Sequence, residues 1–303
     1  MRDMIAPRLL APGTRFGPYE IIREIGTGWS AVYYLAAGGV VLDVFWSLPE
    51  DDAWLANRID QAGLATILDH PNLGRLHAAG RIDRQLFLAH EYIDGASVRQ
   101  LQHRAGGGAW ATDAAVALAL GVAGGLAYLH DSAARDGRPL HWVHRKLDAS
   151  SVFVTRDGTV KLSDFALWLP RGDVRSPGMF DPRFARSLSP ELTRAMPTDP
   201  RSELFALGAL LYELTTGRRP FGDPDVFSTM FAVRDAKFAP PSTIVAGYPS
   251  GLERIVLHAL ERDLDLRYQT ADELARDLRA LAAAESLDVS TRVLAAHVTS
   301  PDE

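Results

Sequence analysis

The hydrophobic pattern of the chain changes in character near residue 93. Before that point, short runs rich in β-branched and aromatic residues alternate with glycines, which is typical of strands. These runs are residues 19–25, 31–36, 40–46, 76–81 and 86–92. After that point, longer apolar stretches indicate helices, at residues 114–129, 202–216, 252–260 and 271–284. The pattern predicts an α+β protein with a small β-rich part followed by a larger helical part.

Two further elements interrupt this division. A helix is predicted near residues 53–68, because an acidic stretch precedes it and a His-Pro pair follows it. In the helical part, the strand-like runs 152–155 and 160–162 flank a turn that ends in Gly158, which predicts a hairpin.

The ends of the chain are weakly patterned. We expect an N-terminal extension over residues 1–14 and a polar, partly ordered tail over residues 285–303. The domain between them, residues 15–284, divides into a part over 15–93 and a part over 94–284.

Composition excludes several classes of function. The 303-residue chain has no cysteine, so that disulfides, thiol catalysis and cysteine-bound metals are excluded. Its net charge of -6 argues against a nucleic-acid partner. Residues 1–13 carry an acid and two prolines, unlike a secretory signal, and the apolar stretch 114–129 is short for a membrane span. We therefore expect a cytoplasmic protein with no membrane partner.

A series of short motifs follows one another along the chain. In order they are GTGWSAVY (26–33), VVLD (40–43), DHPNL (69–73), HEYIDG (90–95), HRKLDASS (144–151), KLSDFA (161–166), LSPEL (188–192), RSELFALGALLYELTTGRRPF (201–221) and DLDLRYQTADEL (263–274). This order and spacing resembles the bacterial serine/threonine protein kinase family, from about residue 19 to residue 281. The resemblance implies a two-lobed protein-kinase-like fold, with a β-rich N-lobe over 15–93 and a helical C-lobe over 94–284.

The resemblance also implies where nucleotide would be held, and the N-lobe positions depart from the family. A kinase needs a glycine-rich loop over the phosphates and a strand lysine paired with a helix glutamate. Gly26 and Gly28 remain in the loop, followed by Val32, although a plain hairpin turn explains two glycines equally well. Asp43 stands at the lysine position and Gln61 at the glutamate position.

No other lysine is available to the N-lobe. The first lysine in the chain is Lys146, so that Arg23 is the only cation placed to substitute, and its forked head is not equivalent. We interpret Asp43 as a degenerate pocket position; the alternative is a solvated strand residue. Val41 and His90, at the adenine and gatekeeper positions, and Phe153, beneath the purine, indicate a narrowed pocket.

The catalytic loop departs most from the family. Lys146 stands where the catalytic aspartate belongs, Asp148 where a phosphate-facing lysine belongs, and Ser151 where the metal-binding asparagine belongs. A lysine does not accept a proton near neutral pH unless its pKa is strongly lowered, and Asp148 is expected to face and repel the γ-phosphate. Asp164 is the one chemical residue retained, either as a weak metal ligand or as a local hydrogen-bond acceptor.

Residues that hold the family fold are kept. Glu191 and Arg267 match a buried ion pair, and His144 and Phe165 match a hydrophobic spine. Ser176 is a candidate phosphorylation site in an arginine-rich segment.

These residues predict a pseudokinase, which is a catalytically inactive kinase-like protein that acts through a protein partner, either an active kinase or its substrate. No cofactor is expected. The first alternative is an active serine/threonine kinase that uses ATP and magnesium, with Arg23 and Asp164 as the remaining contacts. The second is a transferase that moves a nucleotidyl or other group on the same fold.

Overall fold

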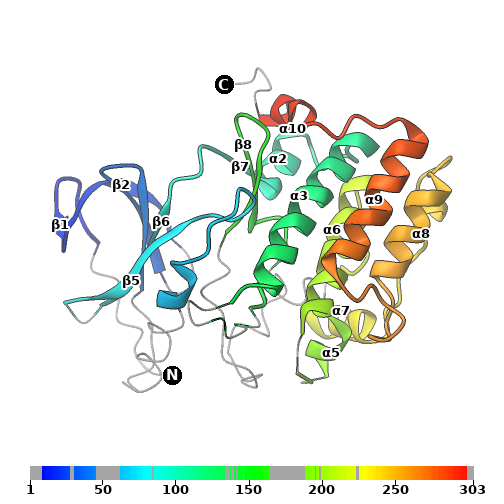
Figure 1. Cartoon of the computed structure of the whole chain (residues 1–303), viewed down its shortest axis with the longest axis horizontal. Helices are drawn as coiled ribbons and strands as arrows, with labels where there is room; N and C mark the ends of the chain where they lie inside the picture. The colour runs from blue at the N-terminus through cyan, green and yellow to red at the C-terminus, as the bar shows by residue number, and fades with distance from the viewer. Residues whose placement is uncertain are drawn as a thin grey trace. The chain divides into compact units, whose positions relative to one another are not determined.

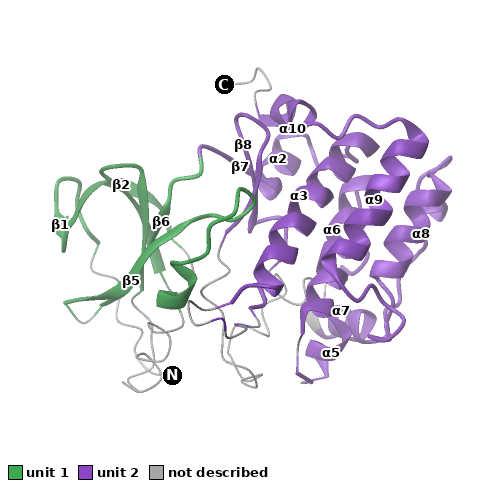
Figure 2. Cartoon of the chain, viewed as in Figure 1, with its two compact units in different colours: residues 1–93 green, residues 94–303 purple. Residues whose placement is uncertain are grey.

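The chain forms two compact units, residues 1–93 and 94–303 (Figure 2). The structure is a computed structural model, and it describes residues 9–27, 31–45, 62–83, 85–133, 137, 140, 142–145, 147–163, 188–194, 196–197, 199–222 and 225–298. Unit 1 is built mainly from strands and unit 2 mainly from helices, which confirms the α+β fold class.

The strands of unit 1 form one antiparallel sheet. They are β1 (Arg15–Phe16), β2 (Tyr19–Thr27), β3 (Ala31–Ala36), β4 (Val40–Phe45), β5 (Leu76–Ile82) and β6 (Gln85–Glu91). Their order across the sheet is β1-β2-β3-β4-β6-β5. Figure 1 labels β1, β2, β5 and β6 of this sheet. Each strand predicted from the sequence is present, and β1 is too short to leave a pattern. Of the predicted helix over 53–68, residues 62–65 are helical and residues 53–61 lie outside the described part.

One face of this sheet forms the core of unit 1. Side chains alternate between the two faces of a strand, so that every second residue points inward. The core cluster on this face contains Phe16, Ile21, Val32, Tyr34, Ala36, Leu42, Val44, Phe87 and Ala89. Full burial of one large apolar side chain contributes ~1.5–3 kcal/mol, so this cluster holds the sheet in one register.

Unit 2 combines helices with a small sheet. The helices are α2 (Val98–Arg104), α3 (Thr112–His130), α5 (Pro190–Thr193), α6 (Pro200–Thr216), α7 (Val226–Arg234), η2 (Pro241–Thr243), α8 (Ser250–Ala259), α9 (Ala271–Glu285) and α10 (Thr291–Val298). The strands β7 (Gly95–Ser97), β8 (Val152–Thr155) and β9 (Val160–Leu162) pair in that order. The predicted hairpin is therefore present as β8 and β9.

The longest helix, α3, forms part of the core of unit 2. It packs against α6, α9 and β9, and its buried face includes Leu118, Val122 and Leu126. By length and composition alone, this 19-residue helix is apolar enough to cross a membrane, contrary to the expectation that the stretch is too short. Because 61% of its most apolar window is buried inside the protein, we interpret α3 as a core helix.

Helix α6, which contains Glu203 and Glu213, has a defined cap at each end. Asp199 caps the first turn by accepting a hydrogen bond from the Arg201 N–H, and Pro200 occupies the first helical position. Gly217 ends the helix in the left-handed conformation, with φ of 68°.

The segment predicted as a polar tail contains a packed helix. Leu294 of α10 is 2% exposed, and the ring of His297 lies 4.6 Å from that of Trp110. Gly158, in the β8–β9 turn, has φ of 84°, and a Cβ atom there would lie 1.8 Å from the Thr291 carbonyl oxygen. The turn therefore contacts the first residue of α10 so closely that only glycine fits.

Candidate functional site

A buried carboxylate lies in the sheet of unit 1. Asp43 on β4 is 1% exposed, which rules out the solvated alternative. Its Oδ1 atom lies 2.9 Å from Nε2 of His90 on β6. Val41 is directly opposite His90 in the strand register, so that Asp43 and His90 are diagonal neighbours on one face of the sheet. Because a buried carboxylate without a partner is costly, His90 is the group that allows Asp43 to stay buried.

The same face carries other residues expected near nucleotide. Tyr33 pairs directly with Asp43, and Gly26 pairs with Tyr33. Gly26 has no positive φ, and a Cβ atom there would make an ordinary contact, 3.6 Å from Cδ2 of Tyr33. The explanation of Gly26 by a hairpin turn is therefore wrong, since Gly26 lies within β2. Gly26, Val41, Asp43 and His90 share one side of the sheet.

Val32 does not join this group. It pairs with Val44 and packs in the core cluster, on the face opposite to Asp43. The expectation that Val32 lies with Gly26, Val41 and His90 as part of a remnant nucleotide site is therefore corrected. Adjacent residues of a strand point to opposite faces, and Tyr33 is the neighbour that faces the side of Asp43.

Arg23, the candidate substitute cation, is not paired with Asp43. It is an exposed residue of β2 and lies opposite Leu35, which in turn lies opposite Val41. Two strand spacings, roughly 10 Å, separate β2 from β4. Within the described residues, the guanidinium of Arg23 makes no ion pair or hydrogen bond.

In unit 2, Glu203 of α6 holds the beginning of the HRKLDASS motif. Its Oε1 atom accepts a hydrogen bond from the backbone N–H of Arg145 at 2.5 Å, and Oε2 lies 2.8 Å from Nε2 of His130. Glu203 is 3% exposed. Arg145 has φ of 64°, a conformation that non-glycine residues seldom adopt, and the bond to Glu203 helps to hold it there.

Asp148 is turned toward its own loop. Its Oδ1 atom accepts hydrogen bonds from the Ser150 N–H at 2.7 Å, the Ser150 hydroxyl at 2.5 Å and the Ser151 N–H at 3.3 Å. Its Oδ2 atom lies 3.0 Å from Nη2 of Arg99 on α2. The expectation that Asp148 simply faces and repels a phosphate is therefore corrected, since an arginine and three local donors offset its charge.

Ser151 closes the same loop and is 0% exposed. Its hydroxyl donates to the Asp148 carbonyl oxygen and accepts from the Asp148 N–H, each at 3.1 Å. Its carbonyl oxygen accepts from the Ser163 N–H at 2.8 Å, which connects the loop to the end of β9. Because the hydroxyl donor and one lone pair serve the loop, Ser151 acts as a structural residue here.

A family model described as "Protein tyrosine and serine/threonine kinase" matches residues 51–276. The chain belongs to the protein kinase family.

This member of the kinase family is similar in sequence to protein kinases of several bacteria. It is 32% identical over 281 residues to "Probable serine/threonine-protein kinase SCO3848" of Streptomyces coelicolor, covering 87% of this chain and 40% of that protein. It is 32% identical over 234 residues to "Serine/threonine-protein kinase PknL" of Mycobacterium tuberculosis, covering 77% of this chain and 56% of that protein. The chain thus spans between 40% and 56% of the length of these two relatives.

Solved structures agree on the fold. The kinase domain of Mycobacterium tuberculosis PknI has a TM-score of 0.68, with 22% identity and coverage of 90% of this chain and 99% of that one. This similarity confirms the protein kinase fold, with a β-sheet N-lobe and a helical C-lobe.

The ion pair expected to stabilise the kinase C-lobe is present. Arg267 donates to both carboxylate oxygens of Glu191, at 3.1 and 3.3 Å, and to the carbonyl oxygens of Arg201 and Glu261, each at 2.9 Å. Glu191 is 3% exposed and Arg267 2%. Burial raises the pKa of Glu191, but the hydrogen bonds and charge of Arg267 outweigh it, so that the pKa lies below the ordinary value.

His144, expected in the hydrophobic spine, is 0% exposed, in keeping with a core position. The candidates that lie outside the described residues are Gly28, Gln61, Lys146, Asp164, Phe165 and Ser176.

The sequence does not predict three contacts of this kinase-family site. His90 is expected only as a gatekeeper, whereas it is the partner of Asp43. No motif marks His130 and Arg99, which pair with Glu203 and Asp148. A buried acid in a strand is a signal that a basic partner is near, but only the sheet register identifies which residue it is.

Proposed function

We propose that this chain is a catalytically inactive protein kinase-like protein, a pseudokinase, which acts as a protein-binding or regulatory module in bacterial signalling. We place it in the cytoplasm, with a protein partner that is an active kinase or its substrate, and without a nucleic acid or a membrane as partner. The observation that carries the proposal is the buried Asp43–His90 pair.

The charge of Asp43 opposes the binding of nucleotide phosphates. By resemblance, Asp43 occupies the position of the lysine that holds them. A carboxylate about 4 Å from a phosphate charge opposes binding by ~4 kcal/mol at an effective dielectric near 20. Micromolar affinity amounts to only ~8 kcal/mol. A protonated His90 would neutralise the Asp43 carboxylate, but the pair would then have no net positive charge to attract the phosphates.

The burial of Asp43 strengthens this argument. A surface carboxylate can rotate away from an incoming phosphate, whereas Asp43 is 1% exposed and held at 2.9 Å by His90. Ser151 supports the same conclusion, because its hydroxyl serves the Asp148 backbone. The match to the kinase family model begins at residue 51, after the strand of Asp43, which also supports a divergent N-lobe.

The alternative is an active serine/threonine kinase, and the names of the curated relatives favour it. Under that alternative, Arg23 and Asp164 contact ATP and magnesium. Asp148 repels phosphate less than its charge alone suggests, because Arg99 is bonded to it.

Radiolabelled ATP distinguishes the two. We expect the purified chain to incorporate no phosphate into itself or into casein, under conditions in which an active bacterial kinase labels both. We also expect no thermal shift with ATP, ATP plus magnesium or ATP plus manganese. Incorporation that disappears in Asp164→Ala would establish the active kinase instead.

A further inference from the structure

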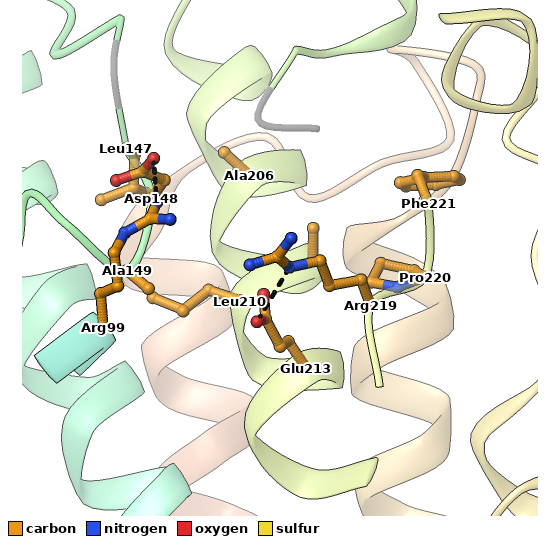
Figure 3. Close-up of a pocket in the computed structure, with 11 residues that line it drawn as sticks. Arg99, Leu147, Asp148, Ala149, Ala206, Leu210, Glu213, Arg219, Pro220 and Phe221 are labelled. Atoms are coloured by element: carbon orange, nitrogen blue, oxygen red, sulfur yellow. Dashed lines mark hydrogen bonds and ion pairs between the residues drawn. The ribbon is translucent and has the colours of Figure 1, made fainter. Parts of the chain in front are cut away.

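A small pocket in unit 2 brings two arginines together. Arg99 enters it from α2, and Arg219 enters from the segment that follows α6 (Figure 3). Their guanidinium groups point toward one another across the pocket in Figure 3. The lining also contains apolar side chains, among them Leu147, Leu210 and Phe221.

Both arginines retain hydrogen-bond donors. A guanidinium has five N–H donors. Within the described part of the chain, that of Arg99 uses one for Asp148, and that of Arg219 uses one for Glu213, at 3.2 Å. The Arg99 and Arg219 side chains are 44% and 38% exposed, so a ligand can reach them.

The two carboxylates of the pocket are less open to a new partner. Asp148 already accepts bonds at both oxygens. Glu213 accepts from Arg219 at Oε1, and its Oε2 atom accepts no bond from the described residues. The unused groups are therefore guanidinium N–H donors and one carboxylate oxygen. Because Arg99 and Arg219 are each paired with a carboxylate, an anion is held by these free N–H donors and not by a net positive charge of the pocket. These groups are complementary to a ligand in which an anionic group lies next to an N–H donor.

The volume of the pocket limits how much of a ligand can enter it. Its volume is about 50 Å³. Pockets that enclose whole small-molecule ligands start near ~300 Å³. The pocket therefore accommodates the end of one side chain, while the rest of the ligand lies outside on the surface.

We propose that this pocket binds an anionic side chain, the carboxylate of Asp or Glu or a phosphate, on an extended segment of a protein partner. Arg99 and Arg219 hold the anion by charge-assisted hydrogen bonds, which suit both groups because guanidinium is planar and forked. The free oxygen of Glu213 accepts a backbone N–H of the segment. This inference rests on the proposed function, since it locates the partner-binding surface of the pseudokinase.

The proposal can be tested by measuring the binding of four fluorescent nine-residue peptides to the full chain in the absence of nucleotide. They share one neutral sequence, and their central residue is glutamate, phosphoserine, serine or lysine. We expect fluorescence polarisation to give at least tenfold tighter binding for glutamate or phosphoserine than for serine and lysine. Comparing glutamate with phosphoserine shows which anion is preferred, and inorganic phosphate as a competitor shows whether the anion alone suffices.

Variants link the binding to the pocket. Arg99→Ala and Arg219→Ala are each expected to weaken the anionic peptides at least fivefold. The matched control is Arg218→Ala, an exposed neighbour that does not line the pocket. The proposal is overturned if the four peptides bind alike or not at all, if Arg218→Ala has the same effect as Arg219→Ala, or if free phosphate binds as tightly as the phosphopeptide. Phosphate transfer in the radiolabel assay would instead remove the pseudokinase proposal and leave this binding result standing.

Discussion

The Oδ1 atom of Asp43 and the Nε2 atom of His90 lie 2.9 Å apart in the N-lobe sheet, on strands β4 and β6. The Asp43 carboxylate can be buried because Nε2 of His90 is its hydrogen-bond partner. The same contact accounts for a histidine at a position where kinases usually have a hydrophobic residue. The side chains of this pair are 2% and 25% exposed, so that water replaces little of the interaction.

The first prediction concerns the stability of this pair. His90→Leu leaves the Asp43 carboxylate buried without a partner and is expected to cost ~3–5 kcal/mol in unfolding free energy. Asp43→Leu combined with His90→Leu removes both polar groups and is expected to cost less than His90→Leu alone. Urea denaturation of the two single variants and the double variant completes the cycle. Additive losses in the double variant would show that the residues are not coupled.

The second prediction concerns acid sensitivity through Glu191. Because its pKa in the folded protein lies below the ordinary value of 4.5, its ion pair contributes full stability above that value. The contribution is lost as the pH falls through the lower, folded pKa. Glu191→Gln should be destabilised near pH 7 and show a flatter decline of unfolding free energy below pH ~4.5. Parallel curves for the two proteins in acid would contradict the lowered pKa.

A third prediction tests the contact between the β8–β9 turn and α10. Gly158→Ala introduces a Cβ atom 1.8 Å from the Thr291 carbonyl oxygen, in addition to strain at φ of 84°. Gly247→Ala is the matched control, since Gly247 has φ of 73° and nothing within 4 Å of the added atom. Left-handed strain costs ~1–2 kcal/mol in both variants. We expect a larger loss for Gly158→Ala, with faster hydrogen exchange in α10; equal exchange in the two variants would show that the turn does not hold α10.

The fourth prediction concerns Glu203. Glu203→Ala removes the acceptor of the Arg145 N–H and the partner of His130, so that two part-buried polar groups lose a partner. The expected cost is ~2–6 kcal/mol, or ~1–3 kcal/mol for each group. Glu213→Ala, on the same helix but half-buried and bonded to an exposed arginine, serves as the control and should cost under ~1 kcal/mol. Thermal and urea unfolding measure both. A loss in Glu213→Ala as large as in Glu203→Ala would contradict the role of Glu203.

The sequence by itself determined the strands, the long helices and the family. Alternating and helical patterns are local properties, and the β8–β9 hairpin follows directly from its turn residues. The Glu191–Arg267 pair was also predictable, because both residues match family motifs. The same local pattern missed α10, since a short amphipathic helix in a polar segment leaves a weak signal.

Only the tertiary structure decided which residues meet. The sequence places Val32 and Tyr33 side by side, but the strand register sends Val32 into the core and Tyr33 to the face of Asp43. The sequence shows the charge of Asp148 but not that Arg99, 49 positions away, offsets it. Asp43 and His90 are 47 positions apart, and their pairing depends on the order of β4 and β6 in the sheet. Contacts over such separations arise when strands and helices pack, and no local pattern of residues encodes them.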